Sequence, residues 1–242
     1  MPVNVPGPRA ASVLAVLALA AAPAALAQPA TPPQTAAQAP TTAPAAPVGL
    51  ALVVFPAKGA KTLKVTSPAF ADGGEIPMAN TRWGANVFPG LSWGKGPYGT
   101  RSFVVIMQDA DVNFRGGPLL HWTMYAIPAA VTKLAAGMKD PPPGASYGPN
   151  VRAPNQPYMG PHTPPGAKHH YHFAVLALDR DIPVDPALNY DALAADISGH
   201  VLASGEVVGL GHAPPDAPPP APPPRDFPKP VPATPAPAAP SR

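Results

Sequence analysis

Three histidines gather around a tyrosine in one short stretch of this chain. The order is His169, His170, Tyr171 and His172, followed at once by the apolar run 173–178. This run is rich in branched and aromatic residues and too short for a helix, so it indicates a buried strand. Because strand side chains alternate, His169 and Tyr171 should share one face. His170 and His172 should share the other, so one pair can line a pocket while the other points away.

A loop rich in glycine and proline precedes these residues. Residues 160–166 read GPHTPPG, and Gly and Pro fix backbone angles that a regular element cannot hold. An imidazolium, a tyrosine hydroxyl and the backbone N–H groups of such a loop together suit a phosphate or a carboxylate. The stretch therefore favours the binding of a small anion.

Two other segments supply partners for the histidines. Asp109 and Asp111 close the apolar run 102–108, and His121 lies inside the run 119–127. A carboxylate at one strand end beside a histidine from another strand orients the imidazole and holds it protonated. Taken singly, the aspartates are turn residues and His121 is a hydrogen-bonded core histidine. Their combination predicts an anion pocket.

A metal site is the alternative interpretation of the same histidines. His170 and His172 form an H-x-H pair of the kind that binds zinc, copper or iron. His121, His162 or His169 would supply the third ligand, but no acidic residue stands at a fixed spacing as a fourth. This alternative is a metal-dependent enzyme. A nucleophilic hydrolase has less support, because the chain contains no cysteine and its spacing places no serine beside a base.

The elements that must position these residues are short apolar runs. They recur at 48–55, 62–66, 91–93, 102–108 and 119–127, each bounded by Gly, Pro or Asp. This spacing is typical of an all-β sandwich or barrel. Both the odd-numbered and the even-numbered residues of 103–107 are apolar, so this strand should be covered on both faces. Trp83, Trp93 and Trp122 are expected in the core.

One segment near the end of the domain predicts a helix. Asp185 can cap it, with Pro186 in the first helical position. A broadly helical spacing continues through Leu188, Leu193, Ile197 and Val201. Gly199 and Gly205 then break the pattern, so we expect one or two short helices followed by a last strand over 206–210. The domain is predicted to be mostly β.

The N-terminus has the three parts of a secretory signal over residues 1–27. Arg9 supplies positive charge, 12–22 is an apolar run short for a membrane span, and Ala25-Leu26-Ala27 matches a signal-peptidase site. We expect cleavage after Ala27, a periplasmic or secreted protein, and no transmembrane segment in the mature chain. With no cysteine, disulfides and a lipid on a cysteine at the cleavage site are excluded.

Composition divides the rest of the chain. Much of the chain's content of 42 prolines falls in 28–47 and 213–242. These segments are nearly free of branched apolar residues and predict disordered linkers. Residues 48–212 remain as one folded domain. The chain has 16 basic and 13 acidic residues and no basic block, so nucleic acid is not an expected partner.

The motifs, taken in order, resemble one known family. The first half carries SPAF-DGG-IP (67–77), LSW (91–93) and D-x-D (109–111). The second half carries HW (121–122) with IP (127–128), YxGP (158–161), PPG (164–166), HxY (169–171) and GHVLA (199–203). Together they resemble the phosphatidylethanolamine-binding protein family, in the bacterial branch often called Raf-kinase-inhibitor-like.

The resemblance implies an antiparallel β-sandwich with a small pocket for phosphate-type anions or phospholipid head groups, and no cofactor. By matched position, the pocket residues are Asp109, His121, His169 and Tyr171, with Pro161 and its neighbours as the wall. It implies a binding protein rather than an enzyme, with inhibition of a protease or kinase as a related role. Export makes a cytosolic kinase an implausible target.

The chain departs from the family pattern in four places. The family's DPDxP is here 109–113 without its prolines, with Ala110 in the second position. The arginine usual between the family's His and Tyr is His170, and the cysteine usual after GP is His162. The loop that follows is slightly longer.

Overall fold

The computed structural model describes residue 46 and residues 48–218. The signal peptide expected over 1–27 lies outside these residues, as does most of the linkers expected over 28–47 and 213–242. The elements in chain order are α1 (Ala51–Val54), the 3-10 helix η1 (Met78–Asn80), β1 (Leu91–Ser92), β2 (Ser102–Phe114), β3 (Gly117–Pro128), β4 (Lys133–Leu134), β5 (Ser146–Tyr147), β6 (Lys168–Leu178), α2 (Tyr190–Ile197) and β7 (Val201–His212).

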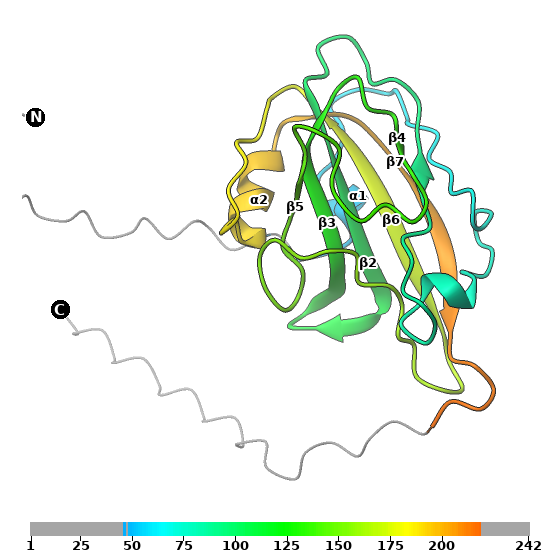
Figure 1. The fold of residues 1–242 in the computed structure, drawn as a ribbon. Coiled ribbons are helices and arrows are strands. Elements are labelled where there is room, and N and C mark those ends of the chain that lie inside the picture. The colour runs from blue at the N-terminus through cyan, green and yellow to red at the C-terminus, as the bar shows by residue number, and fades with distance from the viewer. Residues whose placement is uncertain (1–45, 47, 219–242) are drawn as a thin grey trace, which may run out of the picture. The chain divides into compact units, whose positions relative to one another are not determined.

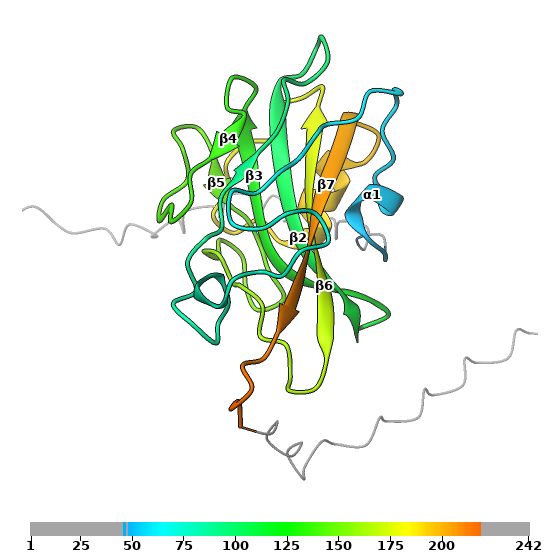
Figure 2. The same ribbon diagram turned by 90° about the vertical axis from the view of Figure 1, so that its right-hand side faces the viewer.

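Five strands form one antiparallel sheet in the order β5-β3-β2-β6-β7 (Figure 1). Strands β1 and β4 pair antiparallel as a second, two-stranded sheet. The four long strands run side by side through the middle of the domain, with irregular segments in front of them in the turned view (Figure 2). The fold is therefore mostly β with antiparallel sheets, as the sequence predicted, and it has two short α-helices, of which only α2 lies near the C-terminal end of the domain, where helices were expected.

Both faces of the large sheet are covered. Phe103, Val105 and Met107 of β2 enter a core that also contains Trp93 and Trp122. The alternate β2 side chains enter a second core, together with residues of α1 and α2. The expectation that the run 103–107 is covered on both sides is confirmed. The side chains of β2 therefore separate two distinct interiors, which we call the tryptophan-side core and the helix-side core.

The N-terminal run over 48–55 is not the expected strand. Ala51–Val54 form the helix α1, with the N–H groups of Val53 and Val54 bonded to the carbonyl of Leu50. Ala51 and Phe55 lie one turn apart, and both are buried in the helix-side core. A short apolar run satisfies helix and strand patterns equally, so periodicity alone does not separate them.

The expected strand over 62–66 is reduced to two isolated bridges, Thr62 to Ser204 and Thr66 to Ser92. The chain crosses β7 here at very close range. A Cβ on Gly205 would overlap the carbonyl oxygen of Leu63, so only glycine admits this crossing.

The predicted helix begins later than Asp185. Its cap is Asn189, whose side chain accepts the N–H of Ala192 over 2.9 Å, whereas Asp185 accepts the N–H of Ala187 in a preceding turn. Asn and Asp are comparable caps, so the sequence did not distinguish them. Gly199 follows the helix with a positive φ of 73°. Val201 then opens β7, which is longer than the predicted strand over 206–210.

One tryptophan lies outside the expected core. Trp93 and Trp122 are buried, but Trp83 is half-buried and stacks on His162. Among the helices of the described residues, none is both long and apolar enough to reach across a membrane.

Candidate functional site

Four of the predicted site residues line one cavity of about 190 Å³. Asp109 comes from β2, His121 from β3, and His169 and Tyr171 from β6. Tyr171 belongs to the tryptophan-side core. The cavity therefore lies on that side of the sheet, where the three strands adjoin.

Strand register explains how three of these residues meet. Asp109 lies directly opposite Tyr171, and opposed residues share a face of the sheet. His169, two residues earlier on β6, falls on the same face. The His169 Nδ1–H donates to Asp109 Oδ2 over 2.8 Å, and Asp109 Oδ1 accepts the N–H of Asp111 over 3.0 Å. Asp109 is 1% exposed, so these bonds replace the hydration that its carboxylate has lost.

A β-bulge brings His121 into the cavity. Trp122 pairs with Met107 and Leu120 with Gln108, which leaves His121 without a partner on β2. A bulge re-aims a side chain that strict alternation would send to the opposite face. Leu120 accordingly enters the helix-side core while His121 lines the cavity.

His121 is buried and neutral near pH 7. Its Nδ1–H donates to the carbonyl of Met159 over 3.1 Å, and its ring meets the edge of Tyr171 at 5.1 Å between centroids. Burial lowers the pKa of the imidazole, although the Met159 carbonyl and the Asp109 carboxylate oppose this. With Nδ1 carrying the proton, Nε2 of the neutral ring is an acceptor.

Tyr171 is held by the loop and by β7. Its hydroxyl lies 3.0 Å from Thr163 Oγ1, and burial raises its pKa far above the usual range, so it stays a protonated donor. A Cβ on Gly211 would lie 2.5 Å from the Tyr171 ring and 3.0 Å from Pro161. Glycine at this position therefore leaves room for the ring.

Pro161 does not line the cavity itself. It lies on the β7 side of Tyr171, near Gly211, and its carbonyl accepts the N–H of Arg82 over 2.8 Å. The wall expected here is formed by neighbours of Pro161, namely Met159, His162 and Pro164.

Sequence reasoning missed two arginines that line the cavity. Arg82 and Arg152 are exposed, come from separate loops, and make no salt bridge within residues 48–218. The main chain of each loop is held by a hydrogen bond. The Arg82 N–H donates to the Pro161 carbonyl over 2.8 Å, and the Arg152 N–H donates to Asn150 Oδ1 over 2.8 Å. No spacing rule links these residues to the histidines, since only the tertiary fold brings the loops together.

His162 forms part of the same rim. Its ring stacks on Trp83 at 4.2 Å between centroids, and the Trp83 indole N–H donates to the carbonyl of Thr163 over 3.0 Å. Burial and the nearby charge of Arg82 lower the pKa of His162, so it too is neutral at pH 7.

The other two histidines of β6 point away from the cavity, as strand alternation predicted. His170 contacts Asp111 at 3.0 Å, and His172 contacts Glu206 at 3.0 Å. Within the part of the chain that the structure describes, no three His, Cys, Asp or Glu side chains are grouped to hold a metal ion. This arrangement does not favour the metal-dependent alternative.

Two stretches match the G-x-S-x-G pattern of hydrolase nucleophiles, 90–94 and 144–148. Ser92 and Ser146 both lie in two-residue antiparallel strands, not on the strand-to-helix turn that exposes such a nucleophile. No hydrogen bond joins either serine to a histidine of the described residues.

Comparison with known proteins gives matches to one family in both sequence and structure. The family model described as phosphatidylethanolamine-binding protein matches residues 66–211. A UPF0098 protein of Chlamydia muridarum is 34% identical over 150 residues, which span 61% of this chain and 97% of that relative. A Mycobacterium tuberculosis relative, designated a candidate lipoprotein and called LppC, is 35% identical over 132 residues, or 54% of this chain and 63% of that protein.

A solved structure agrees with these sequence matches. The crystal structure of Escherichia coli YbcL, described as a new member of the mammalian PEBP family, superposes with a TM-score of 0.57 at 30% identity. The superposition covers 64% of this chain and 100% of YbcL.

Proposed function

Because this chain belongs to the phosphatidylethanolamine-binding protein family, we propose that it is an exported binding protein for a phosphate-type anion. The ligand is a phosphate monoester or a phospholipid head group, held in the cavity lined by Asp109, His121, His169 and Tyr171. In this role the chain binds its ligand and does not transform it.

The pairing of His169 with a buried carboxylate carries this proposal. Asp109 fixes the Nδ1–H of His169 at 2.8 Å, which leaves Nε2 of the ring for a ligand and sets its orientation. The protonated ring donates from Nε2 to an anion, and a charge-assisted hydrogen bond of this kind is about twice as strong as a neutral one.

The charges around the cavity also favour an anion. Asp109 contributes one negative charge, and Arg82 and Arg152 contribute two positive charges. The lining is therefore net positive even with every histidine neutral. The guanidinium groups are exposed, so they attract the anion at the mouth, while the interior donors hold it.

The Tyr171 hydroxyl is expected to contribute to this binding. Tyr171→Phe should weaken phosphate affinity about fivefold, because a neutral hydrogen bond is worth about 1 kcal/mol. Calorimetric titration of the full-length chain with inorganic phosphate measures the change. The control is His172→Ala, on the opposite face of β6 and paired with Glu206, which should bind phosphate normally. If His172→Ala abolishes binding while Tyr171→Phe has no effect, the site is on the wrong face of the strand.

Anion affinity is expected to rise as the pH falls below about 6.5, the ordinary pKa of histidine. Burial lowers the pKa of His121, and burial with the charge of Arg82 lowers that of His162. Both rings are therefore neutral at pH 7, and the rise should continue below the ordinary histidine range. Each proton that a ring gains adds a positive charge that attracts the anion.

Sulfate is the suitable probe for this pH dependence, because its own charge does not change over the range as that of phosphate does. Sulfate affinity is measured by calorimetry at successive pH values. A constant or falling affinity towards low pH would contradict a role for these rings.

Export of the chain is supported by its N-terminal sequence and by one relative. Residues 1–27 have the order of a secretory signal, and LppC is designated a candidate lipoprotein. This chain has no cysteine, so an anchor on a cysteine is not carried over from that relative. N-terminal sequencing of protein from the envelope fraction should begin at Gln28, and a retained Met1 there would contradict export by cleavage.

A further inference from the structure

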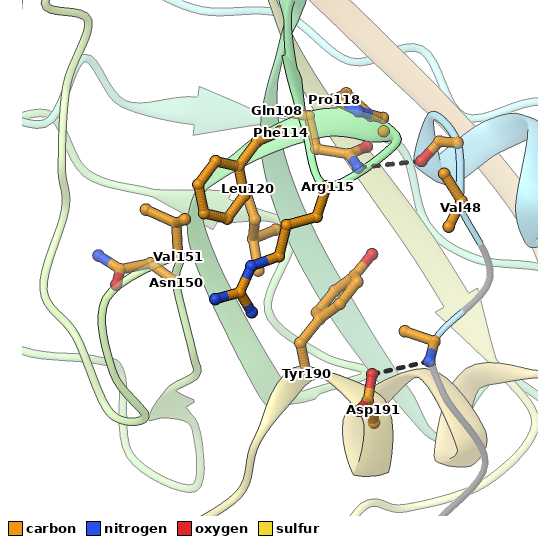
Figure 3. A pocket seen from close by; sticks show the side chains of 13 residues that line it. Val48, Gln108, Phe114, Arg115, Pro118, Leu120, Asn150, Val151, Tyr190 and Asp191 are labelled. Carbon is orange, nitrogen blue, oxygen red and sulfur yellow. Dashed lines mark hydrogen bonds between the residues drawn. The ribbon is translucent and has the colours of Figure 1, made fainter. Parts of the chain in front are cut away.

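A second cavity has a volume of about 290 Å³ and is lined by residues from the helix side of the sheet. Figure 3 shows the side chains that line it. Gln108 of β2 and Leu120 of β3 line it, whereas their chain neighbours Asp109 and His121 line the anion cavity. Val151 lines both. The alternation of β2 and the bulge in β3 thus place two cavities back to back across the same hairpin.

The lining of this helix-side cavity is largely apolar. Leu120, Val151 and Pro118 line it together with the exposed ring of Phe114 and the ring of Tyr190. A cavity of about 150 Å³ lined by apolar side chains holds benzene, and small-molecule sites begin at about 300 Å³. A volume of about 290 Å³ therefore suits a ligand of one or two fused rings.

One buried polar atom in this cavity lacks a partner. The hydroxyl oxygen of Tyr190 is buried and makes no hydrogen bond with any residue of 48–218. Figure 3 shows the hydroxyl directed into the space between Arg115 and Val48. Burial, with a smaller contribution from the charge of Asp191, raises the pKa of Tyr190 to about 12, so the group stays a donor. A buried hydroxyl without a partner is costly, and such groups are uncommon in native proteins.

The positively charged side chain of Arg115 lines the same cavity. Arg115 forms no salt bridge among the described residues, and its guanidinium carbon lies 5.3 Å from the centre of the Phe114 ring. Its side chain extends from the hairpin towards Tyr190, whereas Asp191 accepts the N–H of Ala46 over 2.7 Å at the other side of the cavity (Figure 3).

The backbone of Arg115 has a strained conformation for a residue with a large side chain. Arg115 and Gly116 form the turn between β2 and β3 with φ angles of 55° and 94°. Two successive positive φ angles favour Asn-Gly in a hairpin turn, and a bulky residue is strained there. The arginine at this position thus brings a positive charge to the cavity but makes the hairpin turn less stable.

We propose that the helix-side cavity is a second binding site, for a small aromatic carboxylate. The ring lies between Phe114 and Tyr190, and the carboxylate accepts hydrogen bonds from the Arg115 guanidinium and the Tyr190 hydroxyl. This site shares no polar group with the anion cavity, so it stands independently of the function proposed above.

The test is titration of the 15N-labelled full-length chain with naphthalene-2-carboxylate, followed by NMR. Saturable shifts are expected at the amides of Leu120, Val151 and Tyr190. The matched neutral probe is naphthalene-2-carboxamide, which has the same rings without the charge. It should bind at least tenfold more weakly, because its neutral amide does not form an ion pair with the Arg115 guanidinium.

Two variants separate binding from folding. Arg115→Asn should raise the thermal midpoint, because Asn-Gly suits the turn, and should reduce carboxylate affinity at least tenfold. Tyr190→Phe removes the unpartnered hydroxyl, so it should not lower the midpoint, yet it should weaken the carboxylate about fivefold. Arg115→Asn should weaken the carboxamide less than it weakens the carboxylate, because the neutral carbonyl of the amide accepts from Arg115 without the attraction between opposite charges.

His169→Gln, in the anion cavity, is the control and should leave the naphthalene-2-carboxylate shifts unchanged. The proposal is overturned if the probe gives no saturable shift at these three amides. It is equally overturned if carboxylate and carboxamide bind alike, if Arg115→Asn binds as the wild type does, or if the shifts disappear in His169→Gln.

Discussion

Replacing Asp109 with alanine is expected to lower the free energy of unfolding by about 3 kcal/mol and phosphate affinity at least tenfold. The carboxylate is 1% exposed and is bonded to His169 at 2.8 Å. Removal of one partner from a buried pair leaves the other with an uncompensated polar or charged group. The ring of His169 also loses the acceptor that fixes its Nδ1–H. Urea unfolding and phosphate titration measure the two losses.

Asp111→Ala is the matched control for this change. Asp111 also contacts a histidine, but its side chain and that of His170 are 38% and 54% exposed. Exposed pairs contribute about 0–1 kcal/mol, so this variant should be nearly as stable as the wild type and bind phosphate normally. Equal stability of the two alanine variants would show that burial of Asp109 has no special importance.

His169→Gln is expected to reduce phosphate affinity by about 10- to 100-fold with a smaller loss of stability. Glutamine retains an N–H donor for Asp109 but cannot carry a positive charge, and hydrogen bonds to charged groups contribute about 1.5–3 kcal/mol. Calorimetric titration with phosphate at pH 6 measures the loss.

The neighbouring histidine provides the control. His170→Gln changes the same residue type on the same strand, but on the exposed face, and its affinity should stay within about twofold of the wild type. If the two glutamine variants bind alike, the charge of His169 does not hold the anion.

Much of the site was predictable from the sequence, because the alternation of side chains along a strand decides which face of the sheet each residue lies on. The alternation of side chains along β6 placed His169 and Tyr171 on one face and His170 and His172 on the other. The apolar run 103–107 predicted a strand covered on both sides. These inferences needed only a period of two.

Other parts depended on contacts distant in sequence. His121 reaches the cavity through a bulge that is visible only when β3 is paired with β2. Arg82 and Arg152 come from loops whose positions are fixed by the whole domain. Trp83 was expected in the core, but it stacks on His162 instead. The start of the helix depended on a choice between Asp185 and Asn189, two residues with equal capping ability.

The most direct test of the anion site is a phosphate titration of the 15N-labelled full-length chain, followed through the imidazole signals of its seven histidines. The proposed function predicts saturable shifts of the His121 and His169 ring signals with one common dissociation constant. His170, His172 and His200 should remain unchanged, because none of them lines the cavity. Saturable shifts at His170 or His172, with His121 and His169 unchanged, would contradict the proposed site.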